Sequence, residues 1–576
     1  MPISASFIRE KMSTILEHFP EGFEPRQIQR DILRAIEEQL KSGYKTIILS
    51  APTGVGKSLV AATLARYYGK SFVITASKQL QDQYSRDFKF LNPVKGKSNF
   101  ACLKLMEHQG IPKIETKKAI QKGLTCEKGL CEETVKVKGK EVKEFCKFKP
   151  RIGELEPNSK NPYCFYYEQK YRALVSDHSI WNYAAYFQLM RFGRKAYADY
   201  INKPIAIFDE AHKIEDQINQ FIGIDIYNTH IAECEIDIKS YSLDNVDLVI
   251  QLLDDLAKSY SKQIKDLQES KSFQINPDYM HLTRLESRYE RMANAHVELE
   301  LNKDNFVIND PYFDERGNLK SLSIKPLDIS KYVTTFFDVD TQIFMSATID
   351  KASFCENTGL DPSKVAFVDT PKSPFSPDKR RINLLNVRKI SYSSSWDDER
   401  AVISKIDEIL SQHENERGLI LTSSEKRCVD IQNNLSEKNK SRIRICHSRN
   451  ENGMTQDEVI QEHSMDEDGV LLSSSLWEGV DLKDDLSRFQ IIAKAPYPNL
   501  SEKRTKIKMQ KFPLWYKSQT LVKLLQGFGR SIRSEDDWAV TYVLDEVASD
   551  LLYQCKPMIP KAYHDVLGFP SYPQSV

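Results

Sequence analysis

The stretch Ala51–Ser58, which reads Ala-Pro-Thr-Gly-Val-Gly-Lys-Ser, decides the fold of this 576-residue chain. It follows the apolar run Thr46–Ser50 and precedes a segment with helical periodicity, residues 59–65. A strand, a glycine-rich turn and a helix start form a phosphate-binding loop. Its N–H groups surround the phosphates, the lysine reaches the β- and γ-phosphates, and the serine binds Mg²⁺. The sequence therefore predicts a nucleoside triphosphate site centred on Lys57 and Ser58.

The composition excludes several classes of protein. The chain has 81 Lys and Arg against 81 Asp and Glu, so any basic surface must be local. No apolar run reaches the roughly 18 residues of a membrane span, and residues 1–19 lack a signal-peptide pattern. We expect a soluble intracellular protein of several domains with no membrane partner. It would be cytoplasmic or nucleoid-associated, or nuclear if the source is eukaryotic.

Two further segments place the phosphate loop in an α/β domain. Residues 72–76 read as a second buried strand and residues 77–88 as the helix after it, an alternation that predicts a parallel sheet. Upstream, Arg26 and Gln29 form an Arg-x-x-Gln pair about two dozen residues before the loop. A glutamine amide can pair with both N6 and N7 of adenine, so the pair predicts adenine recognition, although a surface helix start fits it too.

The segment Pro204–His212 is an apolar strand that ends in Asp-Glu-Ala-His. Acidic residues at a strand end beside a phosphate loop have defined roles. We expect Asp209 to hold Mg²⁺ and Glu210 to orient and deprotonate the attacking water.

Between these motifs lies a cysteine-rich, basic segment. Residues 95–151 contain 15 Lys or Arg against 7 Asp or Glu and have no sustained periodicity. Five of the ten cysteines fall within 63 residues, which in an intracellular protein indicates a metal site before disulfides. Thiolate-bound metal would supply stability that the segment lacks. The lysines suit a phosphate backbone, and the aromatic residues around Cys164 suit stacked bases.

The rest of the chain contains a second insertion, the end of the first α/β pattern and a second α/β pattern. Residues 213–326 are helical in pattern and form a second insertion, after which Gln342–Thr348 runs into Ser-Ala-Thr. A proline-rich linker, residues 371–377, leads to a second α/β pattern that contains Glu-Gly-Val-Asp at 478–481. Arg530 and Arg533, three residues apart on a helix, share a face and can both reach a γ-phosphate held on another domain.

In this order the motifs resemble those of superfamily 2 helicases, and the cysteine insertion narrows the resemblance to the XPD-like, DinG-related iron–sulfur DNA helicases. The resemblance covers nearly the whole chain. It implies an ATP hydrolase with a DEAH box, with ATP, Mg²⁺ and a [4Fe–4S] cluster as cofactors. The implied catalytic residues are Lys57, Asp209, Glu210, Gln526, Arg530 and Arg533. The implied nucleotide contacts are Arg26, Gln29, Thr53, Gly54, Val55, Gly56, Lys57, Ser58 and Asp481, with Ser58 and Asp209 as Mg²⁺ ligands.

The resemblance also implies the domain organisation. The fold class is α/β, with two RecA-like parallel-sheet motor domains, and two insertions interrupt the first. We expect motor domain 1 at residues 1–94, 176–217 and 328–378 (the last with the linker), the iron–sulfur domain at 95–175, a helical arch-like insertion at 218–327 and motor domain 2 at 379–576.

Five cysteines compete for four places on the cluster. Cys102 and Cys164 match the first and last ligand positions of the family. The resemblance of the sequence around Cys131 and Cys146 to the DinG-like spacing favours these two for the other places, with Cys126 as the alternative to Cys131. A four-cysteine zinc site is the competing metal assignment.

The resemblance implies 5′→3′ unwinding of DNA driven by ATP, with a role in DNA repair. The expected partners are single-stranded and forked DNA and repair-complex proteins, and oligomerisation is not required. Two other functions stay open. One is a single-strand translocase or protein-displacing remodeller that does not unwind, and the other is a redox-sensing nucleic-acid-binding protein.

Overall fold

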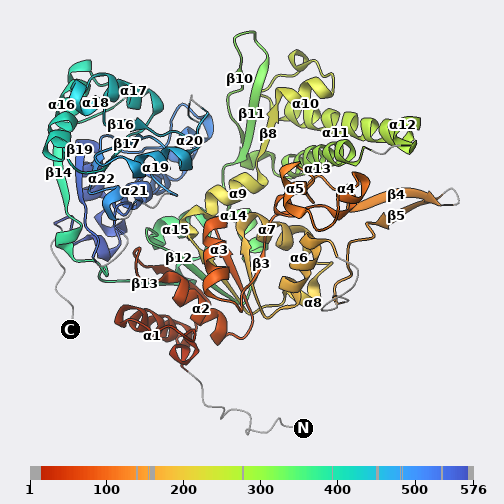
Figure 1. Ribbon diagram of the computed structural model, residues 1–576, viewed down its shortest axis with the longest axis horizontal. Helices are drawn as coiled ribbons and strands as arrows, with labels where there is room; N and C mark the ends of the chain where they lie inside the picture. The colour runs from red at the N-terminus through yellow and green to blue at the C-terminus, as the bar shows by residue number, and fades with distance from the viewer. Residues whose placement is uncertain are drawn as a thin grey trace, which may run out of the picture.

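The computed structural model describes residues 14–137, 140–153, 155, 163–275, 278–391, 393–448, 450, 453–479, 482, 484–532 and 536–568. Motor domain 1 lies centrally in Figure 1, with motor domain 2 on one side and the two insertions on the other. In the described ranges, no helix combines the length and apolar character needed to cross a membrane.

Motor domain 1 is built on a seven-stranded sheet in which every neighbouring pair of strands is parallel. The predicted strands of the phosphate loop and of the Asp-Glu-Ala-His segment both belong to it. In spatial order the strands are β13 (Val365–Asp369), β1 (Thr46–Ser50), β12 (Thr341–Ser346), β7 (Ile205–Asp209), β2 (Ser71–Thr75), β6 (His178–Asn182) and β3 (Asn92–Val94).

Apolar residues on both faces of this sheet are buried, which explains the continuous apolar runs of its strands. Ile47 and Leu49 of β1 pack on one face against the first two helices, whereas Ile48 faces the opposite core with Phe208 and Phe344, whose rings stack 4.9 Å apart. The helices around the sheet are α1 (Gln27–Lys41), α2 (Lys57–Tyr67), α3 (Lys78–Asp87), α6 (Phe165–Val175), α7 (Tyr183–Gln188), α8 (Ala198–Ile201), α9 (Ile214–Ile222), α14 (Ser330–Phe336) and α15 (Lys351–Thr358).

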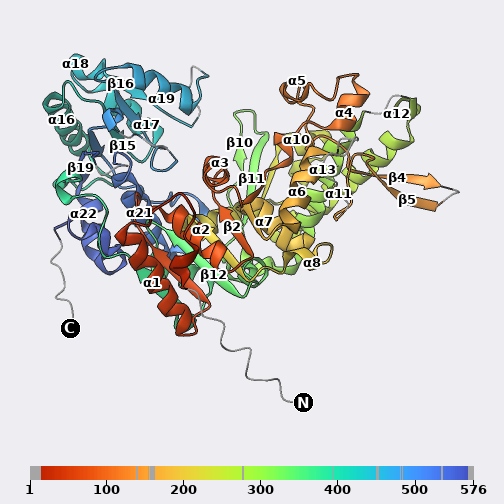
Figure 2. The same cartoon turned by 60° about the horizontal axis from the view of Figure 1, so that its bottom comes forward.

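The cysteine-rich insertion leaves the sheet after β3 and returns through α6. It contains two short helices, α4 (Leu103–His108) and α5 (Thr116–Gln121), and an antiparallel hairpin of β4 (Glu132–Val137) and β5 (Lys140–Phe145). Its apolar core is small and includes three of the five clustered cysteines. The hairpin projects away from the rest of the molecule in Figures 1 and 2.

The arch insertion is built on two long helices, α11 (Val246–Glu269) and α13 (Tyr279–Leu301), which pack against each other. The helical pattern of the sequence did not reveal its strands. An antiparallel sheet runs from the root of the arch, where β9 pairs with the end of β11, to a β10–β11 hairpin that extends away from motor domain 1 (Figure 1). Its strands are β8 (Ile224–Tyr227), β9 (Phe306–Ile308), β10 (Tyr312–Phe313) and β11 (Leu319–Pro326). The remaining arch helices are α10 (Asn228–Glu233) and α12 (Lys271–Ile275). Tyr279 contacts both Lys104 and His108, which joins the arch to the cysteine-rich insertion.

Motor domain 2 has a six-stranded parallel sheet with a buried core on each face. In spatial order its strands are β14 (Ile382–Arg388), β19 (Val540–Asp545), β18 (Phe489–Ile492), β15 (Gly418–Leu421), β17 (Val470–Ser473) and β16 (Ile443–Ile445). Its helices are α16 (Trp396–Gln412), α17 (Glu425–Asn433), α18 (Glu437–Lys440), α19 (Gln456–Met465), α20 (Lys503–Lys511), α21 (Pro513–Phe528) and α22 (Glu546–Gln554).

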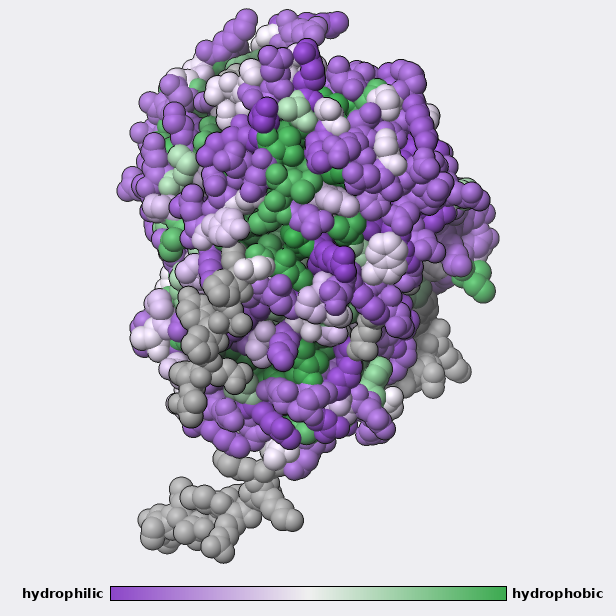
Figure 3. Space-filling view, turned by 90° about the vertical axis from the view of Figure 1, so that its left-hand side faces the viewer, coloured by the Kyte–Doolittle hydropathy of each residue, from purple (hydrophilic) through white to green (hydrophobic). Residues whose placement is uncertain are grey.

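Seen from the left-hand side of Figure 1, the surface is mostly hydrophilic and surrounds a central band of hydrophobic residues (Figure 3). The predicted fold class, two parallel-sheet α/β domains with insertions in the first, is confirmed.

Candidate active site

The phosphate loop connects β1 to α2, as the sequence predicts. Gly54 and Gly56 have φ angles of 82° and 83°, in the left-handed region that favours glycine. A Cβ on Gly54 would lie 2.2 Å from the ring of Phe375, and one on Gly56 would lie 2.5 Å from Nε2 of Gln29. Both glycines are therefore required by backbone conformation and by close packing.

The predicted adenine-side residues lie against this loop. The Gln29 side chain donates to the carbonyl of Val55 at 2.9 Å, and a guanidinium nitrogen of Arg26 donates to the carbonyl of Gly54 at 2.5 Å. Both residues thus brace the phosphate loop, and their role in adenine recognition stays a prediction.

Asp209 and Glu210 lie at the carboxyl end of β7, close to Lys57. Burial raises the pKa of Asp209 to about 6, with Glu210 adding to the effect and Lys57 opposing it. Burial would also raise the pKa of Glu210, but Lys57, together with Lys213 and Arg530, brings it below its ordinary value. Glu210 has a φ of 52°, an unusual conformation for a non-glycine residue. The strand end thus holds two carboxylates with different proton affinities, one of them on strained backbone.

Two tyrosines that the sequence did not single out hold Asp209 in place. The buried hydroxyl of Tyr84, on α3, donates to Oδ2 of Asp209 at 2.8 Å. Tyr183 donates to the backbone carbonyl of Asp209 at 3.0 Å. Neither position belongs to a recognisable motif, so no spacing in the sequence pointed to them.

His212 connects the two motor domains. One ring nitrogen, Nδ1, lies 2.8 Å from the Ser346 hydroxyl, and the other, Nε2, lies 2.7 Å from the amide nitrogen of Gln526 on α21. Burial lowers the pKa of His212, which favours the neutral ring and lets Nε2 accept from the Gln526 amide. The Asp-Glu-Ala-His, Ser-Ala-Thr and Gln526 segments therefore form one hydrogen-bonded chain.

A cavity of about 520 Å³ lies between the domains at this point and is lined by Thr53, Glu210, Gln526 and Arg530, among others. Nε of Arg530 donates to the carbonyl of Trp477 at 3.0 Å, and its charge contributes to the low pKa of Glu210. Lys213 forms an ion pair with Glu478 at 3.0 Å, a second polar contact across the interface. The prediction that Arg530 lies on a helix is wrong, because α21 ends at Phe528 and Arg530 lies in the segment after it. Two predicted site residues, Asp481 and Arg533, lie outside the described residues.

The five clustered cysteines converge on one small cavity, which Lys104, Phe148 and Tyr167 also line. The cysteines are Cys102, Cys126, Cys131, Cys146 and Cys164. The sulfurs of Cys126 and Cys164 are 3.8 Å apart. Among the described residues, no three His, Cys, Asp or Glu side chains stand in the arrangement of a ready-made metal-ion site. In chemistry, however, a pocket of five thiols fits an iron–sulfur cluster. The choice between Cys126 and Cys131 stays a prediction.

Another cavity, of about 630 Å³, lies where the cysteine-rich insertion, motor domain 1 and the arch meet. Lys97, Lys170 and Tyr166 line its basic side, and Lys97 lies over the Tyr166 ring at 5.8 Å. Burial and the nearby Lys97 lower the pKa of Lys170 to about 8. Glu286 and Glu290 of α13 line the same cavity. The basic side brings together the charge and the aromatic residues that the sequence placed near the cysteines.

Two protein families match parts of the chain. Residues 407–561 match the family of helicase C-terminal domains, and residues 22–236 match that of the type III restriction enzyme res subunit. Two relatives are both named ATP-dependent DNA helicase YoaA. The Haemophilus influenzae protein is 22% identical and the Escherichia coli protein 23%, over 91% of this chain and 91% and 92% of theirs.

Solved structures show the likeness of fold. A structure titled XPD helicase aligns with a TM-score of 0.59 and 17% identity, over 95% of this chain and 99% of its own. The Xpd4 protein of S. tokodaii aligns with a TM-score of 0.54 and 14% identity, over 95% and 98%. The predicted resemblance to XPD-like, DinG-related helicases is confirmed.

Replacing Tyr84 with phenylalanine tests its support of Asp209. We expect ATP hydrolysis to fall roughly tenfold at low Mg²⁺, because a hydrogen bond to a charged group contributes about 1.5–3 kcal/mol. That bond lowers the pKa of Asp209, so its loss should move the acid limb of the pH–rate profile to higher pH. The measurement is hydrolysis against Mg²⁺ and pH, with Tyr44→Phe as the control. An unchanged Mg²⁺ requirement would contradict the assignment.

Proposed function

Because this chain resembles XPD-like, DinG-related helicases in sequence and in fold, we propose that it is an ATP-dependent DNA helicase that moves along single-stranded DNA and unwinds duplex. The observation that carries the proposal is the cavity between the motor domains. Phosphate-loop, Asp-Glu-Ala-His and Ser-Ala-Thr residues of motor domain 1 meet Gln526 and Arg530 of motor domain 2 there. A site divided between two domains links hydrolysis to their relative motion.

For hydrolysis, each residue has a role that its position supports. Lys57 and the backbone of the phosphate loop bind the β- and γ-phosphates, and Ser58 and Asp209 would hold Mg²⁺. Glu210, whose lowered pKa keeps it ionised near neutral pH, accepts the proton of the attacking water. Arg530 stabilises the charge that develops on the γ-phosphate, and Arg533 shares this role by resemblance.

The hydrogen bond between His212 and Gln526 connects ATP hydrolysis to the relative motion of the two motor domains. The ring of His212 is hydrogen-bonded on both sides, to Ser346 within motor domain 1 and to Gln526 across the interface. A change at the γ-phosphate that moves Gln526 or Arg530 therefore acts on the Asp-Glu-Ala-His segment as well.

DNA would contact the basic side of the cavity beside the cysteine-rich insertion. Lys97 and Lys170 suit backbone phosphates, and Tyr166 suits a stacked base. The 5′→3′ direction and a role in DNA repair rest on the family resemblance. So do repair-complex partners and action without oligomerisation. A cytoplasmic or nucleoid-associated localisation, or a nuclear one if the source is eukaryotic, rests on the sequence pattern instead.

The cysteine cavity would hold a [4Fe–4S] cluster, which gives a small apolar core a covalent framework. We assign Cys102, Cys131, Cys146 and Cys164 as its ligands. When bound, the cluster would order the segment that separates the two DNA strands. A zinc site with the same ligands is the alternative.

A translocase that displaces proteins without unwinding is the second candidate function, because the divided nucleotide site serves both activities equally. Strand displacement on a duplex with a 5′ single-stranded tail separates the two candidates. A protein that hydrolyses ATP on single strands but leaves this duplex paired would be a translocase. DNA affinity that switches with cluster oxidation, without unwinding, would indicate a redox sensor.

Replacing Lys57 with alanine should abolish ATP hydrolysis and leave single-stranded DNA binding largely intact. The reason is that Lys57 acts at the phosphates, whereas the basic DNA surface lies beside the cysteine-rich insertion. Hydrolysis and fluorescence anisotropy with labelled single strands measure the two effects. Lys70→Ala, an exposed lysine soon after the same helix, is the control. An equal loss of DNA binding at low salt would refute this division of roles.

Replacing Arg530 with alanine should lower turnover by about 10³-fold or more while ATP affinity stays within a few-fold, because such arginines act on transition-state charge. Steady-state hydrolysis and binding of a fluorescent ATP analogue measure the two quantities. Arg400→Ala, on the surface of α16, is the control. Weak nucleotide binding with normal turnover would instead assign Arg530 to ground-state binding.

Serine at Cys102, Cys131, Cys146 or Cys164 should remove iron and strand separation but retain DNA-stimulated hydrolysis, because four thiolates suffice for the cluster and the motor domains have separate cores. Cys126→Ser should retain iron and both activities. Iron content, visible absorbance, hydrolysis and unwinding are the measurements, with buried Cys234→Ser as the control. A colourless Cys126→Ser protein beside a brown Cys131→Ser protein would exchange their assignments.

A further inference from the structure

A buried polar network joins motor domain 1, motor domain 2 and the root of the arch. At its centre is Glu215 on α9, three residues after His212 and only 3% exposed. Arg504 and Lys508 of α20 form ion pairs with Oε1 of Glu215. Trp515 of α21 and Asn357 of α15 donate to Oε2, the latter at 2.9 Å.

Glu215 keeps its charge although it is buried, whereas burial lowers the pKa of Lys508 and the Glu215 carboxylate opposes that effect. Burial would raise the pKa of Glu215, but Lys508 and Arg504 lower it to about 2. Lys508 is 1% exposed and also donates to Asn357 at 2.7 Å. A buried charge that loses its partner is costly, so the ions must stay together when the domains move.

Arg504 differs from the other members because it also holds the arch. One guanidinium nitrogen, Nη2, donates to Glu215 at 2.9 Å, while Nε donates to the carbonyl of Pro326 at 2.8 Å. Pro326 is the last residue of β11, the strand that returns from the arch. The backbone N–H of Arg504 donates to Asn309, next to β9, at 3.0 Å, and Asn309 donates to Glu502 at 3.0 Å. Motor domain 2 is therefore attached to the arch through the start of α20.

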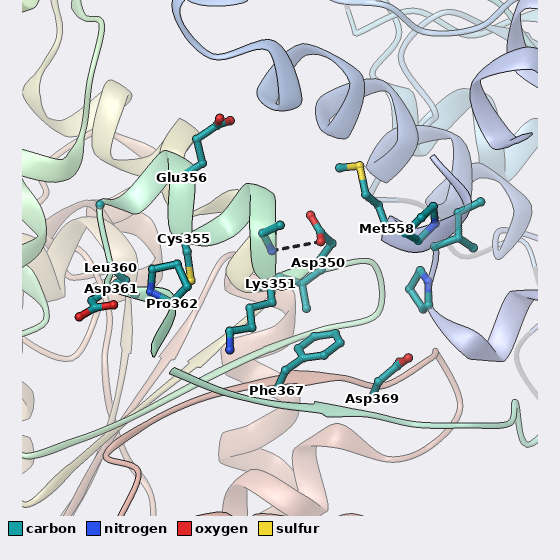
Figure 4. Close-up of a pocket in the computed structure, with 16 residues that line it drawn as sticks. Asp350, Lys351, Cys355, Glu356, Leu360, Asp361, Pro362, Phe367, Asp369 and Met558 are labelled. Carbon is teal, nitrogen blue, oxygen red and sulfur yellow. Dashed lines mark hydrogen bonds between the residues drawn. The ribbon is translucent and has the colours of Figure 1, made fainter. Parts of the chain in front are cut away.

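The interface is incompletely filled beyond α15. A cavity of about 820 Å³ separates α15 and β13 from the segment 557–560 of motor domain 2. Figure 4 shows Phe367 and Asp369 on one side of this cavity and Met558 on the other, while Glu356 points away from it toward motor domain 2. Space on this scale leaves room for the motor domains to change their relative position without breaking a packed core.

We propose that Arg504 is a positioning residue that couples closure of the motor domains to movement of the arch, an inference that rests on the proposed helicase function. When nucleotide draws motor domain 2 toward motor domain 1, α20 and α9 shift together, because the ion pairs with Glu215 hold the two helices to each other. Because the same guanidinium bonds Glu215 and the Pro326 carbonyl, the root of the arch follows. The planar arginine fork makes both bonds at once, whereas a lysine offers one ammonium group for one of the two positions.

Arg504→Lys is the test variant, because it keeps the positive charge that Glu215 requires but not both bonds. Unnatural amino acids at exposed positions Glu269 in the arch and Arg34 in motor domain 1 would carry a fluorescence donor and acceptor. The probe is ADP with beryllium fluoride, added without DNA. Lys506→Ala, on the exposed face of α20, is the matched control.

In the wild-type protein and in Lys506→Ala we expect the nucleotide to change energy transfer. In Arg504→Lys that change should be lost, and duplex unwound per ATP hydrolysed should fall at least tenfold. Hydrolysis on single-stranded DNA should stay within twofold. Asn309→Ala weakens the same attachment from the arch side. It should reduce both the nucleotide-induced change in energy transfer and the duplex unwound per ATP hydrolysed, and it replaces Arg504→Lys as the test variant if that protein does not fold.

Three results would overturn the inference. The first is a normal change in energy transfer in whichever of Arg504→Lys and Asn309→Ala folds. The second is no change in energy transfer in the wild-type protein. The third is a variant that loses as much hydrolysis as unwinding. If the wild-type arch moves but no duplex is unwound, the proposed helicase function fails while the coupling stands. If duplex is unwound and the arch does not move, the coupling fails alone.

Discussion

Asp209 and Glu210 place two carboxylates side by side at the end of a buried strand, and the elements around them are arranged to control these charges. Lys57 from the phosphate loop lowers the pKa of both, whereas burial and the neighbouring charge raise that of Asp209. Tyr84 and Tyr183 fix the strand end by hydrogen bonds from two helices. The parallel sheet makes this possible, because β1 and β7 end at the same edge.

The contacts that residues 212–215 make with motor domain 2 are polar. His212 meets Gln526, Lys213 meets Glu478, and Glu215 meets Arg504 and Lys508. These motor domain 1 residues come from one short segment, the end of the Asp-Glu-Ala-His motif and the start of α9. A segment with catalytic residues at one end and interdomain ion pairs at the other responds to both the nucleotide and the partner domain. The cavity that His212 and Lys213 line leaves space for that response.

The two insertions are attached in different ways. The cysteine-rich insertion has a small apolar core in which cysteines take part, so its order depends on what the thiols bind. The arch has a larger core along α11 and α13, continuous with that of motor domain 1. Its root also bonds to α20 of motor domain 2 through Arg504. The arch therefore contacts both motor domains. The cysteine-rich insertion contacts the arch at Tyr279.

By itself the sequence determined the two α/β domains, the nucleotide site and the five-cysteine insertion. In each case the chemistry lies in a short local pattern: glycines that need positive φ, acids at a strand end, or clustered thiols. The tertiary structure decided the rest, because the partners are far apart in the chain. Tyr84 and Asp209 are 125 residues apart, Gln526 and His212 are 314, and Arg504 and Glu215 are 289. The strands of the arch escaped notice because three of them have at most four residues and because β8 pairs with β11 across the whole insertion. The convergence of all five thiols on one cavity likewise needed the folded chain, since spacing alone does not say which side chains share a pocket.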